Sequence, residues 1–204
     1  MRWGNVETGN EAELVERLIG ILRATAPLMQ VMRIARRLGL PDWLVFSGAI
    51  YQPVLNHLTS RPPDYAIKDY DLAYFDRSDI SYEAEDAVIR RVQGAFEEPL
   101  QNMVEVRNQA RVHLWFEGKF GEAYTPLSCT AEALERFTSA AFAVGARLDL
   151  DDRLHIQAPF GLADLFALRL RPNPRRQTAG FARTCAGVGR RWPELTIEAN
   201  PSSS

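Results

Sequence analysis

The sequence predicts an α/β (α+β) fold in which a mixed central sheet is flanked by helices. Three observations lead to this prediction. Apolar residues recur at helical spacing over residues 11–38, and polar and apolar residues alternate at strand spacing over residues 69–75 and again over 103–116. Helical and strand patterns that interleave along one chain are typical of a sheet covered by helices.

Length and composition place the chain among ordinary globular proteins. It has 204 residues, of which 46% are apolar and 25% are charged, and one domain is the natural expectation at about 150 residues per domain. We therefore expect a single domain over residues 1–204, with its core at about 12–195 and a short flexible C-terminal tail. A formal charge of -2 and a pI near 6.0 do not indicate nucleic-acid binding and favour a small substrate.

The cysteines and the N-terminal sequence bear on the cell compartment. Cys129 and Cys185 lie far apart and have no CxxC partner, so neither a disulfide framework nor a zinc site is indicated. No basic segment followed by an apolar run opens the sequence, and no run of about 18 apolar residues occurs in it. We expect a cytoplasmic protein without a membrane segment.

The first part of the predicted fold consists of two helices and a strand. Helical spacing covers residues 11–38, and Pro27 divides this stretch into two helices. Gly39 and Pro41 end the second helix, and the apolar run at 43–46 then predicts a buried strand.

A strand-to-helix turn follows at Ser47 and Gly48. Helical spacing returns over residues 50–58, so unpaired N–H groups at the start of this helix point outward from the turn. Such a turn can hold a phosphate group.

Two alternating strands, with a helix between them, form the centre of the prediction. Residues 69–75 read DYDLAYF, residues 103–116 read MVEVRNQARVHLWF, and residues 81–93 form a charged amphipathic helix that begins at Ser81. The polar face of the second strand is predicted to carry Glu105, Arg107, Gln109, Arg111 and His113. Its apolar face is predicted to carry Val104, Val106, Ala110, Val112 and Leu114, with Asn108 among them.

The C-terminal part adds a hairpin and three helices. Helical patterns cover residues 130–141, 161–170 and 178–191. Two short strands at 143–148 and 154–157 form the hairpin.

Asp69 and Asp71 carry the chemistry that the sequence suggests. Carboxylates at positions i and i+2 of a strand project from one face a few ångströms apart, so their repulsion calls for a cation. Mg²⁺, or Mn²⁺ in its place, prefers oxygen ligands and is commonly held by one or two carboxylates together with substrate phosphates. Glu105, on the polar face of the next predicted strand, is the candidate third carboxylate of a two-metal site.

The alternative interpretation of this pair is a solvated turn. Two acids separated by one residue are weak evidence alone, since such pairs often lie on exposed turns or edge strands. Leu72, Tyr74 and Phe75 instead place the acids in an apolar strand, where an unpaired charge is costly. We therefore favour the functional interpretation.

Neighbouring basic and amide residues are further candidates for ligand binding. Lys68 directly precedes the acids and could reach a triphosphate, although a lysine at the start of a strand is more often solvated. Arg107 and Arg111 could bind phosphate or neutralise the acids. Gln109, with Asn108, could contact a base or an acceptor, or could satisfy buried backbone groups.

Together these motifs resemble a known family. An apolar-Gly turn with a following helix, a strand with two acids and a later strand with one acid form the pattern of the DNA polymerase beta-like nucleotidyltransferase superfamily. A bacterial nucleotidyltransferase family first catalogued as a domain of unknown function is similar over about residues 12–195. The similar segments are SGAIYQPVLN at 47–56, KDYDLAYFD at 68–76, EVRNQARVHLWF at 105–116, APFGLADLF at 158–166 and RPNP at 171–174.

The resemblance implies a nucleotidyltransferase fold and a role for each matching residue. Gly48, after Ser47, would lie in a turn that binds phosphate. Asp69 and Asp71 would be metal ligands, and Glu105 would be the third acid.

Two positions depart from the superfamily pattern. Ala49 stands where the superfamily usually has Gly or Ser, and the hydroxyl comes one place earlier, at Ser47. Tyr70 replaces the usual aliphatic residue between the two acids.

The leading functional hypothesis is a metal-dependent enzyme. It would move an NMP group from an NTP to a hydroxyl of a small or macromolecular acceptor and release pyrophosphate, with Mg²⁺ or Mn²⁺ as cofactor. One alternative is a noncatalytic nucleotide-binding module with the same fold, which the departure at Ala49 favours. The other is an antitoxin-like interaction protein that uses the same cleft to contact a partner chain.

Overall fold

The computed structural model describes residues 10–176 and 180–198. The α-helices are α1 (Glu11–Ala24), α2 (Ala26–Leu38), α3 (Gly48–Leu58), α4 (Tyr82–Gln93), α5 (Phe116–Phe120), α6 (Ala163–Phe166) and α7 (Gly180–Gly189). The strands are β1 (Leu44–Phe46), β2 (Tyr70–Tyr74), β3 (Val104–Asn108), β4 (Gly145–Leu148), β5 (Leu154–Gln157), β6 (Arg169–Leu170) and β7 (Thr196–Ile197). Short 3-10 helices are η1 (Leu100–Asn102), η2 (Val112–Leu114), η3 (Thr130–Arg136) and η4 (Ala140–Phe142).

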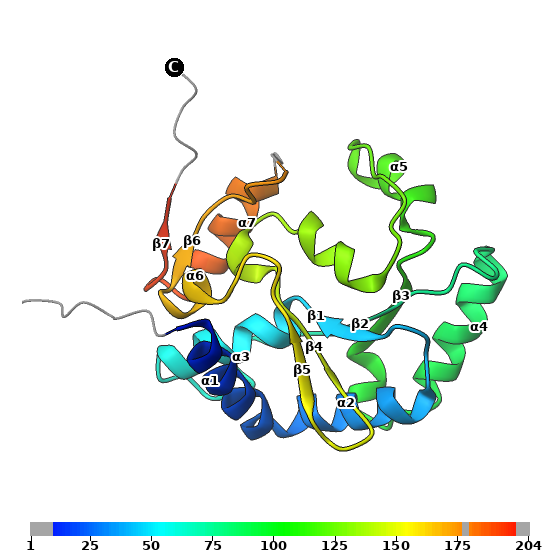
Figure 1. The fold of residues 1–204 in the computed structure, drawn as a ribbon, viewed down its shortest axis with the longest axis horizontal. Coiled ribbons are helices and arrows are strands. Elements are labelled where there is room, and N and C mark those ends of the chain that lie inside the picture. Colours follow the sequence, from blue (N-terminus) through cyan, green and yellow to red (C-terminus); the bar gives the residue numbers. More distant parts are fainter. Residues whose placement is uncertain (1–9, 177–179, 199–204) are drawn as a thin grey trace, which may run out of the picture.

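A five-stranded sheet lies at the centre of the molecule, in the order β3-β2-β1-β4-β5 (Figure 1). β2 and β3 run parallel, whereas the other neighbouring pairs run antiparallel. A parallel pair needs a crossover connection, and α4 lies in the connection between β2 and β3. The predicted mixed sheet flanked by helices is confirmed.

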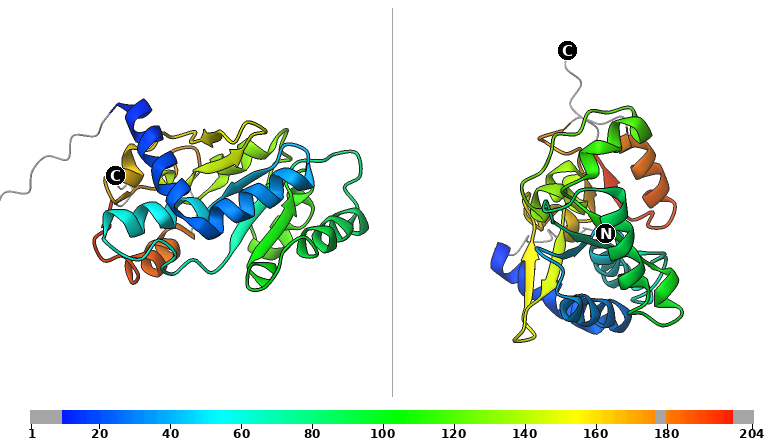
Figure 2. Two further views of the ribbon diagram at one scale, coloured as in Figure 1. Left: turned by 90° about the horizontal axis from the view of Figure 1, so that it is seen from below. Right: turned by 90° about the vertical axis from the view of Figure 1, so that its right-hand side faces the viewer.

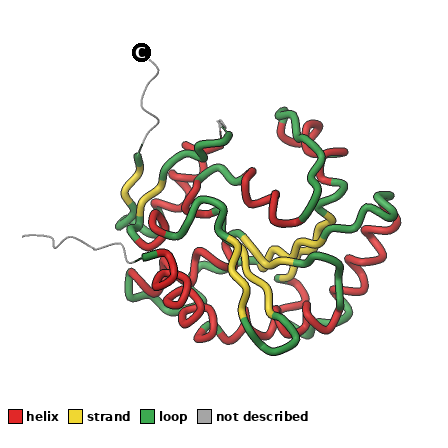
Figure 3. Tube along the Cα trace, in the orientation of Figure 1, coloured by secondary structure: helices red, strands yellow, loops and turns green. Residues whose placement is uncertain are grey.

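The two sides of the sheet differ in what covers them. On one side, α2 packs against β2 and β4, and α4 packs against β3. In the view from below, α2 crosses in front of the sheet (Figure 2). Short helices and loops, including α5 and α7, lie on the other side (Figure 3). One face of the sheet is therefore covered by long helices, and the other is framed by shorter segments.

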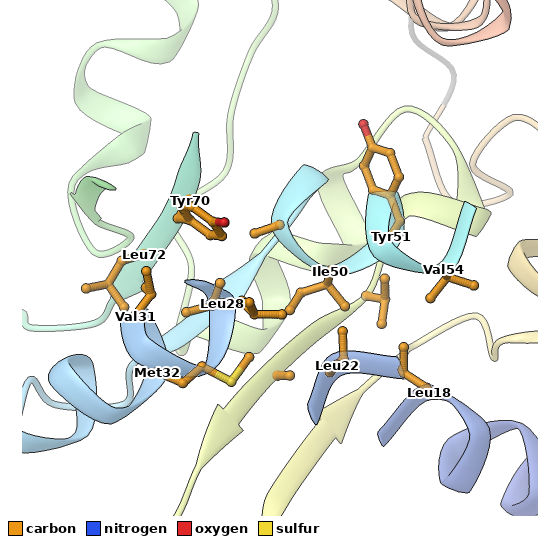
Figure 4. Packing of buried hydrophobic residues seen from close by; sticks show 14 of the residues in the cluster. Leu18, Leu22, Leu28, Val31, Met32, Ile50, Tyr51, Val54, Tyr70 and Leu72 are labelled. Atoms are coloured by element: carbon orange, nitrogen blue, oxygen red, sulfur yellow. The ribbon is translucent and has the colours of Figure 1, made fainter. Parts of the chain in front are cut away.

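The helix-covered face forms the hydrophobic core. Leu28, Val31 and Met32 of α2 pack near Tyr70 and Leu72 of β2 (Figure 4). Each of these side chains is at most 1% exposed. Removing such surface from water contributes about 25 cal/mol per Å² of apolar area, so Tyr70 and Leu72, on either side of Asp71, fix β2 in place.

The helical pattern at residues 11–38 forms two helices, as predicted. Asn10 caps α1 by accepting the Ala12 N–H at 2.7 Å, and Pro27 lies in the first turn of α2, where its missing N–H is tolerated. The helices bend by 94° at Thr25. No single described helix is long and apolar enough to cross a membrane, and α1 and α2 meet this test only as a bent pair.

β3 ends earlier than the strand predicted over residues 103–116. It stops at Asn108, which is paired with Tyr74 at the end of β2. The Asn108 side chain then fixes a turn, because its Oδ1 accepts the N–H groups of Asp76 and Ala110 and its Nδ2 donates to the Asp76 carbonyl. The strand ends where its neighbouring strand ends.

The residues beyond Asn108 do not alternate between two strand faces. η2 and α5 replace the second half of the predicted strand, so the prediction that Gln109, Arg111 and His113 continue its polar face is wrong. Leu114, which was predicted to face the core, is 56% exposed.

The single helix predicted at residues 130–141 is wrong. The 3-10 helices η3 and η4 replace it, because Phe137 and Ser139 between them have extended backbones. Ser139 bridges to Pro172, and the Asn173 amide donates to the Phe137 carbonyl at 2.7 Å. Pairing with the segment after β6 therefore prevents a continuous helix.

The remaining C-terminal predictions have mixed outcomes. The helix predicted at 161–170 is too long, since α6 ends at Phe166 and Leu168 has a left-handed backbone with φ 52°. The hairpin of β4 and β5 and the helix α7 are confirmed. The predicted start of the last helix, at Thr178, and the tail at 199–204 lie outside the described residues.

Candidate active site

The face of the sheet opposite the helical layer brings predicted acids together. In the register, Asp71 of β2 lies between Phe46 of β1 and Glu105 of β3. Paired residues of neighbouring strands lie on the same face, about 5 Å apart. Asp69 is exposed and comes one residue before β2, so all three acids lie at one end of two adjacent strands.

A strained turn joins β1 to α3 beside these acids. Ser47 has φ 63° and ψ -140°, a conformation that non-glycine residues rarely adopt and that costs about 1–3 kcal/mol. Its carbonyl accepts the N–H groups of Ile50 and Tyr51. Its side chain does not cap α3 but forms a hydrogen bond with Asp71. Strain of this kind is commonly found at functional sites.

The start of α3 offers N–H groups to a ligand. Those of Gly48 and Ala49 have no acceptor within residues 10–176 and 180–198. Free N–H groups and the helix dipole make a helix N-terminus attractive to anions. The turn predicted to bind phosphate therefore has the local geometry that such a role requires.

The carboxyl group of Asp71 lies in an environment that disfavours its charge. Burial and then the negative charge of Asp69 raise its pKa to about 6, and Glu105 adds to this rise. The hydrogen bond with Ser47 and the charge of Arg107 oppose it. In the described part of the chain, none of the three acids forms an ion pair. A bound cation would relieve their repulsion.

These carboxylates fit a divalent cation that takes its remaining ligands from water and a substrate. Among the described residues, no three His, Cys, Asp or Glu side chains are grouped as a complete metal site. Asp71 nevertheless interacts electrostatically with both Asp69 and Glu105, so oxygen donors without a neutralising partner are present. Mg²⁺ suits this arrangement, because it usually combines one or two carboxylates with water and substrate phosphates.

A cavity of about 540 Å³, hereafter the basic cavity, opens beside Asp69 and Asp71. Its lining includes the Ser47–Gly48 turn at the start of α3. It also includes the basic residues Lys68, Arg190 and Arg191. Three cationic side chains and a helix N-terminus beside two carboxylates make a suitable environment for a polyphosphate together with a metal ion.

A second cavity of about 610 Å³, hereafter the aromatic cavity, also reaches Asp71 and contains Glu105. Its wall includes the rings of Phe46, Trp115, Phe116, Phe120, Tyr124 and Phe137. Ser47, Tyr51 and Asp71 line both cavities. The two cavities therefore meet at the central acid.

The structure divides the predicted site residues between these cavities. The basic cavity is lined by Gly48, Lys68 and Asp69, the aromatic cavity by Glu105, Arg107 and Gln109, and both by Ser47 and Asp71. Gln109 is buried, and its backbone N–H donates to the Tyr74 carbonyl at 2.7 Å.

Arg111 is the exception among the predicted site residues. It forms a buried ion pair with Glu85 of α4, and its Nε donates to the Ile80 carbonyl at 3.1 Å. It lines neither cavity. The prediction that Arg111 shares a face with Glu105 is wrong, because the turn at Asn108 ends the alternation of the strand.

Several residues of the site were missed by the sequence analysis. Arg190 and Arg191 follow α7 and come close to the acids only through the fold. Tyr51 stacks on Phe142 with ring centroids 4.0 Å apart, and its hydroxyl points away from the core cluster in Figure 4. The basic pair at 190–191 was visible in the sequence, but no spacing rule connects it with Asp71.

A sheet face with clustered acids, next to a strained turn at a helix N-terminus, is the arrangement of a nucleotidyltransferase-fold protein. The chain belongs to the nucleotidyltransferase family, because residues 33–197 match the family model described as "Nucleotidyltransferase". The resemblance to nucleotidyltransferases found in the sequence is thereby confirmed. Membership of this family suggests enzyme activity, at the level of the family only.

A comparison with solved structures supports the same fold. The chain is similar to a structure titled "The NMR structure of the protein reveals a CCA-adding enzyme head domain". The TM-score is 0.74 at 20% identity, over 96% of this chain and 99% of that chain. At this identity the similarity concerns the fold alone. No curated protein matched the sequence.

Proposed function

We propose that the protein transfers an NMP group from an NTP to a hydroxyl group of an acceptor, with release of pyrophosphate. The observation that carries this proposal is the position of Asp71. Its carboxyl group interacts electrostatically with two other acids, has no ion-pair partner in the described chain, and lies where the basic cavity and the aromatic cavity meet. A carboxylate without an ion-pair partner, at the junction of two cavities, is expected where a cation and a substrate bind together.

The residues of the basic cavity would hold the donor. Asp69 and Asp71 would bind Mg²⁺ or Mn²⁺, and Glu105 would complete the site as the third acid. When bound, the cation would neutralise charge on the triphosphate and on the departing pyrophosphate. The N–H groups of the turn at Gly48, together with Lys68, would hold the terminal phosphates.

Glu105 would act on the acceptor side. In-line transfer places the attacking oxygen and the leaving oxygen on opposite sides of the phosphorus. If the pyrophosphate leaves toward Lys68 in the basic cavity, the hydroxyl must approach from the aromatic cavity, where Glu105 lies. Its carboxylate would orient the hydroxyl and receive its proton.

A thermal-shift screen of the four NTPs, with and without Mg²⁺ or Mn²⁺, tests the donor site. Binding to the native state raises the melting temperature with increasing ligand excess. We expect a metal-dependent rise for at least one NTP, and its loss in Asp71→Asn. Asp151→Asn is the matched control, because Asp151 lies in the β4–β5 turn and its side chain is 73% exposed.

The other outcomes of the screen distinguish the alternatives. A metal-dependent rise in melting temperature, with no pyrophosphate released in the presence of any acceptor tried, would favour the noncatalytic nucleotide-binding module. No shift with any NTP, combined with one stable copurifying chain, would favour the interaction protein. A shift that is equal in wild type and Asp71→Asn would contradict the proposed metal site.

A further inference from the structure

The composition of the aromatic cavity contrasts with that of the basic cavity. Trp115, Phe116, Phe120 and Tyr124 come from one segment that spans α5 and the loop after it. Phe116 lies 4.7 Å from Phe120 and 4.5 Å from Tyr124 between ring centroids. Flat apolar surfaces of this kind favour a ligand with a planar ring, since stacked rings attract each other beyond the effect of the area that they bury.

One ring of this segment is left open to solvent. Phe120 is 53% exposed although it lines the cavity. Exposure of a large ring in the lining of a cavity is costly in water and is relieved when a ligand covers it.

Guanidinium groups lie against the same rings. Arg136 lies over Tyr124, with 5.7 Å between its Cζ and the ring centroid, and Arg176 lies over Phe116 at 5.4 Å. Two guanidinium groups therefore line the aromatic cavity beside its rings.

Another arginine of the cavity has its charge available. Arg183 of α7 is exposed and forms no ion pair within residues 10–176 and 180–198. In contrast, Arg176 is engaged by Glu122 and also donates to the Arg136 carbonyl at 2.7 Å. Arg183 is therefore a cation of this cavity with which an incoming anion can pair without breaking an ion pair within the described residues.

We propose that the aromatic cavity binds the acceptor, and that the acceptor is a small molecule with both a planar ring and an anionic group. This inference rests on the proposed function, because it uses Glu105 as the acid on the acceptor side. Ligand cavities of about 300–1,000 Å³ suit small molecules, and the 610 Å³ of this cavity accommodates a molecule of about the size of a nucleoside monophosphate.

The reaction at this site is balanced. The bond between the acceptor oxygen and the α-phosphorus forms while the bond between the α-phosphorus and the pyrophosphate oxygen breaks. The hydroxyl proton passes to Glu105, and pyrophosphate leaves through the basic cavity.

Calorimetric titration of the full chain, without NTP or metal, tests which class of ligand the aromatic cavity binds. The probes form matched sets: AMP and UMP carry a ring and an anion, adenosine and uridine carry the ring alone, and ribose 5-phosphate carries the anion alone. We expect AMP or UMP to bind at least tenfold more tightly than both of its matched partners. Failure of both to bind, or equal binding of ribose 5-phosphate, would overturn the proposal.

Two substitutions assign this binding to the aromatic cavity. Arg183→Gln is expected to weaken binding of the probe about tenfold, or about 1.4 kcal/mol, because it removes a charge-assisted hydrogen bond to the anion. Arg33→Gln is the matched control on the exposed surface of α2 and leaves affinity unchanged. Phe120→Leu keeps an apolar side chain but removes the ring, and it is expected to weaken the probe about fivefold. Unchanged affinity in both Arg183→Gln and Phe120→Leu would overturn the assignment.

A third set of titrations separates this inference from the proposed function. Asp71→Asn is expected to lose metal-dependent NTP binding but to retain the probe, because the probe needs no metal. In wild type, the α,β-methylene analogue of the preferred NTP is expected to bind together with the probe. Displacement of the probe by this analogue would assign the cavity to the donor nucleoside and overturn the proposal. Arg183-dependent binding of single-stranded RNA with a free 3′-hydroxyl, with no small probe bound, would also overturn it.

Discussion

Asp71 and Asp164 are both carboxylates set into the folded molecule, but the protein treats their charges in opposite ways. Asp164 is 5% exposed, and each of its oxygens accepts hydrogen bonds from one arginine. Arg169 binds Oδ1 and Arg171 binds Oδ2, each with a further nitrogen at 2.6 Å. Asp71 has two acids as electrostatic neighbours instead, and its pKa is raised to about 6.

This difference distinguishes Asp164, whose charge stabilises the fold, from Asp71, whose charge can still pair with a bound ligand. The arginines of Asp164 come from β6 and the residue after it, so the ion pairs tie α6 to the following strand. Charge-assisted pairs of this geometry need no external partner. Asp71 lacks such a partner in the described chain, so its charge is best neutralised by something that binds from outside.

The largest expected effect is on turnover, and it tests the Asp71 side of the comparison. Asp71→Asn removes the charge but keeps the shape, and it is expected to lower the kcat/KM of NMP transfer at least a thousandfold, or about 4 kcal/mol of transition-state stabilisation. Pyrophosphate release with AMP or UMP as the acceptor measures it. Asp164→Asn, compared at a temperature where it remains folded, should retain activity within about tenfold. Similar losses in both variants would remove the functional distinction between the two carboxylates.

The next effect is on stability, and it tests the Asp164 side. Asp164→Asn is expected to lower the free energy of unfolding by about 2–3 kcal/mol, because it weakens hydrogen bonds to two charged groups and leaves Arg171 without its ion-pair partner, whereas Arg169 keeps Glu198 at 3.9 Å. The loss stays moderate because Arg169 and Arg171 are 36% and 50% exposed and can reach water. Urea unfolding measures it, with Asp151→Asn as the exposed control. A change in the free energy of unfolding below about 0.5 kcal/mol would show that these ion pairs contribute little to stability.

Much of the fold could be predicted from local sequence signals. Pro27 lies at the start of α2, and the N-cap at Ser81 lies at the start of α4, because these residues act through backbone geometry and hydrogen bonds to their own neighbours. The β4–β5 hairpin follows from two short strands close together in the sequence. Such signals need no knowledge of distant segments.

The errors arose where distant segments decide the structure. Alternation continues past Asn108 in the sequence, yet β3 stops there because β2, its neighbour, ends at Tyr74. Extended backbone at Phe137 and Ser139 likewise depends on pairing with residues after β6. The sequence pattern of one strand carries no information on the length of its neighbour. The predicted strand therefore extended too far, and Arg111 was wrongly placed on its polar face.

The site was predictable where its residues lie close together in the sequence. Asp69 and Asp71 are two residues apart, and Ser47 and Gly48 form one turn. The basic pair at 190–191 and the ring segment around Phe116 reach the acids only after folding. They carry no spacing signature, so only a three-dimensional structure can assign them to the site.

A smaller effect sharpens the comparison through pH. Because the folded-state pKa of Asp71 is raised to about 6 from its ordinary value of 3.8, ionisation of this group favours the unfolded state. The metal-free protein should therefore lose stability as pH rises from about 4 to above 6. Relative to Asp71→Asn, wild type is expected to be up to about 3 kcal/mol less stable at pH 8, with this difference vanishing below pH 4. Urea unfolding of both proteins in EDTA measures this, and a difference that stays constant with pH would contradict it.

The smallest effect separates the two main causes of the raised pKa at Asp71. Burial is the larger cause and the charge of Asp69 is the next, so Asp69→Asn should lower the Asp71 pKa without returning it to the ordinary value of 3.8. Carboxyl carbon NMR of the metal-free protein, titrated from pH 3 to pH 8, measures the change. Asp79→Asn, in an exposed turn at the other end of β2, should leave it unchanged. A full return to the ordinary value in Asp69→Asn would mean that repulsion between the acids, and not burial, sets the charge of Asp71, and a cation alone would then suffice to restore it.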